Sequence, residues 1–183
     1  MSTHTRKLKA GVAAAGAVVA LAVAPAGGAA AGCGSSGGIS SGTSACAPTA
    51  KAKIVNGKAI APVNAPARVK AVIAAANRIE TKPYVYGGGH ARWNDSGYDC
   101  SGSVSYALHG GDFLDSPLPS TGFYRWEQPG LGRWITVFAN GGHAYAVIAG
   151  LRWDTSMTPG DGPGWSAQMR SRAGYVARHP ARF

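Results

Sequence analysis

The cysteine at position 100 carries the clearest sign of chemistry in this chain. It lies in the stretch YDCSGSVSY (residues 98–106), between an acid and three small residues, and no other cysteine follows residue 46. Unpaired backbone N–H groups and the helix dipole stabilise an anion at a helix start, which lowers the pKa of a thiol there. We therefore predict that Cys100 opens a helix and acts as a nucleophile. An inert buried thiol is the alternative.

A reactive thiolate needs a base close by, and that base is normally a histidine. His143 is the best candidate because it follows two glycines and opens a predicted strand, which places its ring at the edge of a sheet. Asp154, on the next predicted strand, could hold the imidazole in one tautomer and orientation. The alternatives to Asp154 are His179 and His90. For His143 and Asp154 alike, the competing interpretation is a polar side chain that faces solvent near a turn.

The residues around the thiol have structural interpretations as well. Asp99 is predicted to cap the helix, since a carboxylate before a helix accepts hydrogen bonds from its first N–H groups. The same carboxylate could hold the cationic amine of a substrate. Gly102 lies inside the predicted helix, where a glycine costs about 1 kcal/mol relative to alanine. We expect close packing of the helix on the sheet to offset this cost, with room for a substrate as the alternative.

Two helices are expected before any long strand. The first is predicted within residues 64–83, with Asn64 as its cap, Pro66 in its first turn and Pro83 at its end. A glycine-rich loop (84–99) then leads to the helix of Cys100, predicted over residues 100–108. The apolar face of the first helix comprises Val69, Val72, Ile73, Ala76 and Ile79, and that of the second comprises Val104, Ala107 and Leu108.

An antiparallel meander is expected to follow the helices. Residues 133–139 and 143–151 read as strands joined by an Asn-Gly turn, and Gly150 permits a second turn into residues 152–156. Residues 112–132, rich in proline and glycine, are expected to form a long surface loop. After Ser156 we expect a Gly/Pro loop and a basic tail. The overall prediction is an α+β fold.

The first 26 residues have the features of an export signal. A basic start precedes an apolar run over residues 11–24, which at 14 residues is shorter than the roughly 20 that span a membrane. Small residues at 24–26 suit cleavage there, and a retained anchor is the alternative. Cys33 could instead mark a lipoprotein site. We therefore expect a secreted or cell-wall associated protein outside the cytoplasm.

Residues 27–52 are rich in Gly, Ser, Ala and Thr and are expected to form a flexible linker before a single domain, 53–183. Cys33 and Cys46 lie close enough in this linker to form a disulfide. That pairing leaves Cys100 as the odd cysteine, which in an exported protein indicates either intermolecular pairing or a thiol kept free for chemistry.

Charge indicates the partners. The net charge of +10 falls to +10 − 3 = +7 once residues 1–26, with three basic residues and no acid, are removed. A basic exported protein is attracted to anionic polymers of the cell envelope, although a merely soluble basic surface explains the charge equally well. No run of basic residues alternates with aromatics, so nucleic acid is not expected as a partner. One cysteine with scattered histidines lacks the spacing of a zinc site. We expect a monomer.

Three segments, KPYVYGGG (82–89), YDCSGSVSYAL (98–108) and GGHAYAVIAG (141–150), resemble the NlpC-type cell-wall cysteine peptidases. The resemblance extends over about residues 69–155. It implies a papain-like α+β fold without metal or cofactor, with Cys100 as nucleophile and His143 as base. It also implies that Tyr84, Asp99 and Ser101 bind the amino end of a peptidoglycan stem peptide.

The chain departs from the family pattern in two places. Residues 122–134 replace the family's usual segment before the histidine strand, which leaves the choice of substrate open. Asp154 stands where the family often has a histidine, which leaves the residue that orients His143 open. The leading hypothesis is an endopeptidase of peptidoglycan stem peptides. The alternatives are an N-acetylmuramoyl-L-alanine amidase of the same fold and a catalytically inactive protein that binds the cell wall.

Overall fold

The computed structural model describes residues 50–157 and 162–183. The predicted signal peptide, the Cys33–Cys46 disulfide and most of the predicted linker lie outside these residues. The last residue of that linker belongs to the fold, because Ala52 is buried and its backbone N–H donates to the carbonyl of Ala149 at 2.8 Å. No helix in the described part of the chain is long and apolar enough to cross a membrane.

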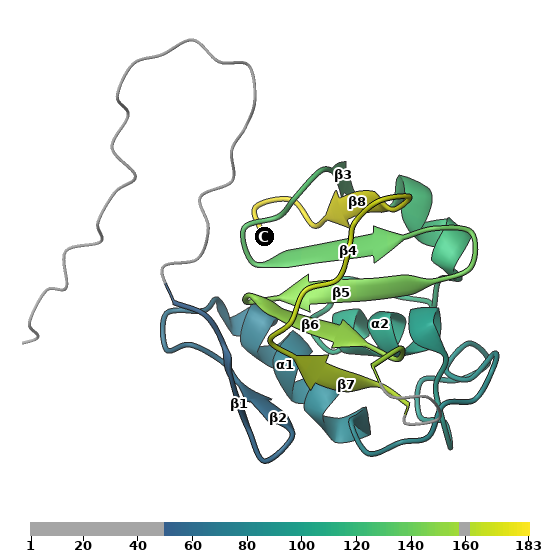
Figure 1. Ribbon diagram of the computed structural model, residues 1–183, viewed down its shortest axis with the longest axis horizontal. Coiled ribbons are helices and arrows are strands. Elements are labelled where there is room, and N and C mark those ends of the chain that lie inside the picture. The colour runs from purple at the N-terminus through teal and green to yellow at the C-terminus, as the bar shows by residue number, and fades with distance from the viewer. Residues whose placement is uncertain (1–49, 158–161) are drawn as a thin grey trace, which may run out of the picture. The chain divides into compact units, whose positions relative to one another are not determined.

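The described residues combine two α-helices with an antiparallel sheet, which confirms the α+β prediction (Figure 1). The strand order of this sheet is β3-β8-β4-β5-β6-β7, and a separate hairpin pairs β1 with β2. The strands are β1 Lys53–Val55, β2 Lys58–Ile60, β3 Gln128–Pro129, β4 Ile135–Ala139, β5 Ala144–Ile148, β6 Leu151–Asp154, β7 Gly164–Ser166 and β8 Val176–His179. The helices are α1 Ala67–Ile79 and α2 Cys100–His109.

Helix α1 buries the face that the sequence predicts. All five expected core residues of α1 are buried, together with Ala75. The expected cap is wrong, because Pro66 rather than Asn64 occupies the N-cap position and provides no side-chain hydrogen bond. A proline suits this place, since its missing N–H would have no partner inside the helix.

Helix α2 is buried on every side from Cys100 to Leu108, and not only along the predicted apolar face. The small side chains in the first turn of α2 permit this burial, because the backbone of neighbouring segments can approach the helix closely. The hydroxyl groups of the buried serines have hydrogen-bond partners in the backbone. Ser103 donates to the carbonyl of Cys100 at 2.9 Å, and Ser105 accepts from the N–H of Leu118 at 3.0 Å. The indole N–H of Trp153 donates to the carbonyl of Ser103 at 3.2 Å and ties α2 to the sheet.

The predicted meander is present as β4, β5 and β6, with a tight turn at residues 140–143 and a second at residues 149–150. Two other expectations were wrong. Residues 112–132 are not only surface loop, since they contain a 3-10 helix, Ser120–Arg125, with the fully buried Phe123, and the short strand β3. The Gly/Pro loop and basic tail expected after Ser156 contain the short strands β7 and β8.

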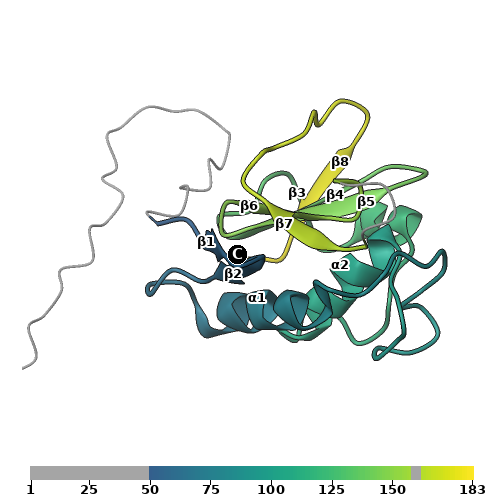
Figure 2. The same ribbon diagram turned by 60° about the horizontal axis from the view of Figure 1, so that its bottom comes forward.

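The two faces of the sheet are covered differently. Helices α1 and α2 lie behind the sheet in Figure 1 and below it in the turned view of Figure 2. The segment that joins β7 to β8, residues 167–175, crosses the opposite face in front of β5 and β4. We call this segment the crossing segment and the face beneath it the outer face. The thiol-bearing helix and the crossing segment thus lie on opposite sides of one sheet.

The glycine inside α2 is explained by packing. A Cβ atom at Gly102 would lie 2.1 Å from the carbonyl oxygen of Gly88, in the glycine-rich loop. Such a contact is impossible without movement of the backbone. The cost of a helical glycine is therefore offset by close approach of the loop to the first turn of α2.

We predict that Gly102→Ala destabilises the protein by about 1 to 3 kcal/mol, the usual cost of overpacking a tight site. The free energy of unfolding in denaturant measures this. Gly142→Ala is the matched control, since a Cβ atom there would meet nothing within 4 Å. A stability for Gly102→Ala equal to that of the control would contradict the packing explanation.

Candidate active site

His143 and Asp154 form the centre of the candidate site. His143 directly precedes β5 and Asp154 ends β6, so the antiparallel register brings both to the same end of the sheet. The Nε2 atom of His143 lies 2.8 Å from Oδ1 of Asp154. Because an ionised carboxylate only accepts hydrogen bonds, Nε2 is the donor and Nδ1 remains for a second partner. The side chain of Asp154 is fully buried, whereas that of His143 is 19% exposed.

The buried carboxylate of Asp154 is held by further donors. Both the N–H and the hydroxyl of Ser156 donate to Oδ1 at 3.1 Å. Arg170, on the crossing segment, donates from Nη1 to Oδ2 at 3.0 Å and to the Ser156 hydroxyl at 2.6 Å. Arg152 adds a longer ion pair at 3.5 Å. These partners keep the carboxylate ionised and fixed in place.

The electrostatics of Asp154 follow from these contacts. Burial raises the pKa of its carboxyl group, but the hydrogen bond and charge of His143, together with those of Arg170, outweigh burial and lower the pKa from 3.8 to about 2. A carboxylate with this pKa is ionised throughout the physiological range. Asp154 can therefore stabilise a positive charge on His143.

Cys100 is the first residue of α2 and is 8% exposed. Burial raises the pKa of its thiol, yet the net shift is downward. A hydrogen bond with the side chain of His143 and one from the backbone N–H of Ala144 lower the pKa, and the charge of His143 adds to this effect. Since Nε2 of His143 bonds Asp154, the nitrogen that meets the thiol is Nδ1.

The pKa of His143 moves in the complementary direction. Burial lowers it, but the hydrogen bonds with Asp154 and Cys100 and their negative charges raise it from 6.5 to about 9. The lowered pKa of the thiol and the raised pKa of the imidazole favour a thiolate–imidazolium pair. Such a pair holds both a nucleophile and a proton donor at neutral pH.

Asp99 caps α2 as expected, accepting from the N–H of Gly102 at 2.7 Å. Its Oδ1 atom also lies 3.2 Å from the hydroxyl of Ser101 and 3.0 Å from Nε2 of His90. Its Oδ2 atom accepts from the N–H of Gly87 at 3.1 Å and from no other group among the described residues. One carboxylate thus ties the helix start to the glycine-rich loop, and Oδ2 keeps capacity for another donor.

Tyr84 lies beside the thiol and the capping acid. Burial raises the pKa of its phenol, and the negative charges of Cys100 and Asp99 raise it further, which requires that both be near. A parallel bridge between Tyr84 and Tyr98 positions the residue, and its side chain remains partly exposed. Tyr84, Asp99 and Ser101 therefore border the thiol on the side of the glycine-rich loop.

The two alternative histidines are placed elsewhere. His90 bonds Asp99, and its Nε2 also lies 3.2 Å from the Ser101 hydroxyl, so it belongs to the capping network. His179 lies in β8, where its Nδ1 meets the carbonyl of Pro180 at 3.1 Å. Asp154, and neither of these two histidines, is the residue bonded to His143.

Two contributors to the site were not expected from the sequence. Arg170 lies in a polar tail that has no local pattern linking it to Asp154. The N–H of Ala144 is a backbone group, and only its place directly after His143 could have indicated its role. Within the described ranges, no group of three or more His, Cys, Asp or Glu residues is arranged to hold a metal ion.

No protein-family model matches the chain, and no curated protein matches it.

We predict that the thiol reacts as an anion well below the ordinary thiol pKa, and that His143→Gln loses this property. The rate of alkylation of Cys100 by iodoacetamide between pH 5 and pH 10 measures it. The hydrogen bond and charge of His143 lower the thiol pKa. The His143→Gln variant should therefore react several-fold more slowly at pH 6, and the midpoint of its curve of alkylation rate against pH should move to higher pH. His179→Gln is the matched control and should keep the original profile. Identical profiles for all three proteins would remove His143 as the partner.

We predict that Arg170→Gln lowers the free energy of unfolding by about 1 to 2 kcal/mol at pH 7, the value of a partly exposed hydrogen bond to a charged group. The pKa of Asp154 is lowered to about 2, so its contribution to stability is present above pH 3.8 and is lost as the pH falls through about 2. The difference between the two proteins should therefore shrink over that range. Denaturant unfolding across the pH series measures it.

Arg172→Gln provides the control for Arg170→Gln. This neighbouring arginine is exposed, and its guanidinium lies 5.8 Å over the ring of Phe138 instead of on Asp154. Its removal should change stability by no more than about 0.5 kcal/mol. Equal losses for both variants would show that general charge, and not the Asp154 contact, accounts for the effect.

Proposed function

We propose that this protein is an exported cysteine hydrolase that cleaves amide bonds in the stem peptides of peptidoglycan. The observation that carries the proposal is a linked set of three groups: a helix-start thiol, a histidine whose hydrogen bond and charge lower the pKa of that thiol, and a buried carboxylate bonded to the histidine. The papain-like fold is part of the same proposal. It is supported by a thiol-bearing helix packed on an antiparallel sheet that supplies the other two groups.

In the first step, the thiolate sulfur of Cys100 attacks the carbonyl carbon of the amide. The developing oxyanion is met by backbone N–H groups near the start of α2, where the helix leaves donors unpaired. The imidazolium of His143 then gives its Nδ1 proton to the leaving nitrogen as the carbon–nitrogen bond breaks. A free amine departs, and a thioester remains on Cys100.

In the second step, water releases the acyl group. Neutral His143 takes a proton from the attacking water, and the thioester breaks to give a carboxylic acid and the thiolate. Asp154 stays ionised throughout, because several donors hold its carboxylate and its pKa is about 2. The role of Asp154 is to keep the ring in one orientation and to stabilise its positive charge.

The residues on the glycine-loop side of the thiol suit a substrate with a free amino group. Oδ2 of Asp99 accepts one hydrogen bond from the described chain, against three contacts at Oδ1, so it has room for an ammonium donor. The partly exposed phenol of Tyr84 lies beside it. In this proposal Tyr84, Asp99 and Ser101 bind the amino end of the stem peptide next to Cys100.

The location of activity outside the cytoplasm is proposed from the N-terminal sequence. A basic start, a short apolar run and small residues near position 26 are typical of an export signal. An exported hydrolase of this kind would meet peptidoglycan directly after translocation. The resemblance of three segments to NlpC-type peptidases adds support, since these segments contain Tyr84, Cys100 and His143.

We predict that purified protein releases peptide fragments from peptidoglycan, and that Cys100→Ala reduces the rate by at least about a thousand-fold because the covalent step is lost. Release is measured by chromatography of soluble fragments. Thermal unfolding of Cys100→Ala confirms that the variant folds, and His179→Gln should retain full activity. Equal release by Cys100→Ala and the original protein would refute the proposal.

Mass spectrometry of the products distinguishes the bond that is cut. Endopeptidase action yields stem-peptide fragments, whereas an amidase acting between sugar and peptide yields intact stem peptides and free lactyl sugars. A catalytically inactive wall-binding protein would sediment with insoluble wall and release neither product. The endopeptidase proposal requires the first of these three results.

A further inference from the structure

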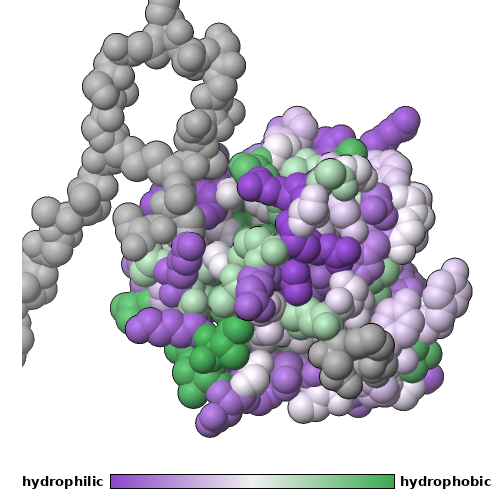
Figure 3. Space-filling model, in the orientation of Figure 1, coloured by the Kyte–Doolittle hydropathy of each residue, from purple (hydrophilic) through white to green (hydrophobic). Residues whose placement is uncertain are grey.

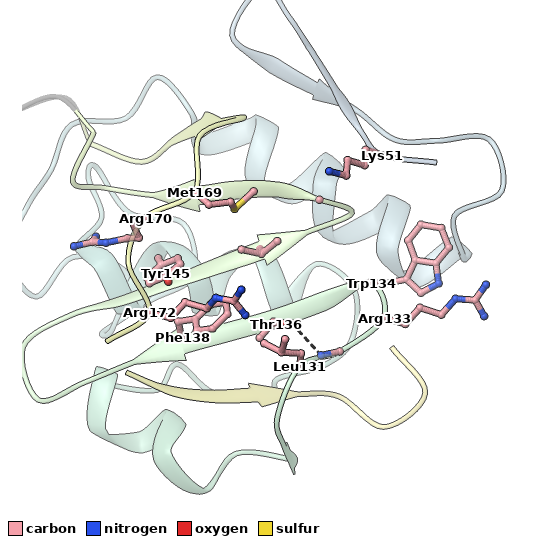
Figure 4. A pocket seen from close by; sticks show the side chains of 13 residues that line it. Lys51, Leu131, Arg133, Trp134, Thr136, Phe138, Tyr145, Met169, Arg170 and Arg172 are labelled. Carbon is pink, nitrogen blue, oxygen red and sulfur yellow. Dashed lines mark hydrogen bonds between the residues drawn. The ribbon is translucent and has the colours of Figure 1, made fainter. Parts of the chain in front are cut away.

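A cavity of about 420 Å³ lies on the outer face of the sheet, away from the helix that bears Cys100 (Figure 4). Side chains of β4 and β5 form its floor, and the crossing segment forms one wall. Its volume is within the range of pockets that bind small ligands. Its lining combines cationic side chains with apolar ones.

The rim of this pocket is basic. Lys51, Arg133 and Arg172 are exposed, and none of them pairs with a carboxylate among residues 50–157 and 162–183. Arg170, the fourth cation, is already bonded to Asp154. Among the residues that the structure describes, no carboxylate lines the pocket. In the orientation of Figure 1, Figure 3 shows strongly hydrophilic surface beside weakly hydrophobic surface in the middle of this face. An anionic ligand would therefore meet three cations whose charge is not neutralised.

The apolar side chains that solvent can reach in this pocket are not aromatic. Leu131 and Met169 are about half exposed, and Val147 is partly exposed. The aromatic residues beneath are covered, since Phe138 is 4% exposed and Tyr145 is 1% exposed. Single-stranded nucleic acid needs exposed aromatic faces on which bases can stack. This pocket offers aliphatic surface instead, against which the C–H groups of a sugar ring can pack through dispersion contacts.

The backbone beneath the pocket is fully engaged in the sheet. Strand β4 pairs with β5 on one side and β8 on the other, and β5 pairs with β4 and β6. An extended peptide binds a sheet by adding a strand to a free edge. The floor of the pocket has no such edge, so recognition there depends on side chains. A ligand here would therefore be held by its charged groups and its apolar surface, and not by backbone pairing.

We propose that this pocket binds a segment of an acidic polysaccharide, with the sugar rings on the aliphatic surface and their carboxylates on Lys51, Arg133 and Arg172. The inference goes beyond the proposed hydrolase activity and does not depend on it. For an exported protein, the polymer would be an anionic glycan of the cell envelope. Binding there would hold the protein on the polymer by the face opposite α2.

The test uses the full chain as Cys100→Ala, so that hydrolysis cannot consume or alter a ligand. The probe is a short oligomer of galacturonic acid, and binding is measured by isothermal titration calorimetry at low and moderate salt. Arg133→Gln combined with Arg172→Gln should weaken binding about ten-fold, as expected for the loss of two exposed ion pairs. Added salt should weaken the binding of the unaltered pocket, because exposed charges are screened.

Lys70→Gln combined with Lys82→Gln is the matched control, because it removes the same charge from exposed residues that do not line the pocket. Its affinity should change less than two-fold. Val147→Phe should weaken binding without any change of charge, because a larger side chain fills the floor.

A neutral maltose oligomer and single-stranded DNA of comparable charge complete the design, and neither should bind through the pocket. Three results would each overturn the proposal. The two double variants could lose equal affinity for the galacturonic acid oligomer, or Val147→Phe could bind it as tightly as the unaltered pocket. The third is DNA binding that is as tight as binding of the oligomer and is weakened as much by loss of Arg133 and Arg172. Turnover of soluble stem peptides by the original protein is measured separately. A failure of the hydrolase proposal would leave the binding result intact, and the reverse also holds.

Discussion

The hydrogen bond between His143 and the buried carboxylate of Asp154 is the constraint on which the candidate site depends. A fully buried carboxylate would be costly if it lacked partners, and here Ser156, Arg170 and His143 supply them. Because this carboxylate stays ionised, the imidazole beside it is held in one orientation with its other nitrogen toward Cys100. The lowered pKa of the thiol and the raised pKa of the imidazole both follow from this geometry.

A second constraint places the thiol itself. Helix α2 is buried on all sides, which is possible because its first turn consists of small residues and its polar groups find partners. Asp99 fastens the helix start to the glycine-rich loop, and Gly102 allows the loop to approach the helix closely. The same small residues that read as poor helix formers therefore allow the thiol of Cys100 to lie between the loop and the sheet.

Local patterns in the sequence were enough to predict much of this arrangement. The meander, both helices, the capping role of Asp99 and the proximity of His143 to Asp154 all follow from periodicity, turn residues and antiparallel geometry. Arg170 could not be predicted, because it reaches Asp154 through a segment that crosses the whole sheet. Strands β7 and β8 were missed for a related reason, since β7 is only three residues long and β8 shows no alternation of buried and exposed residues.

The position of β8 affects the order of folding. This strand lies between β3 and β4, although it comes from residues 176–179 and its neighbours are close together in sequence. Contacts between residues so distant along the chain form late, because a large loop must close first. The crossing segment that carries Arg170 directly precedes β8 in the sequence. A chain synthesised only as far as β6 would thus lack the arginine that bonds Asp154, and the candidate site would be complete only once the crossing segment is in place.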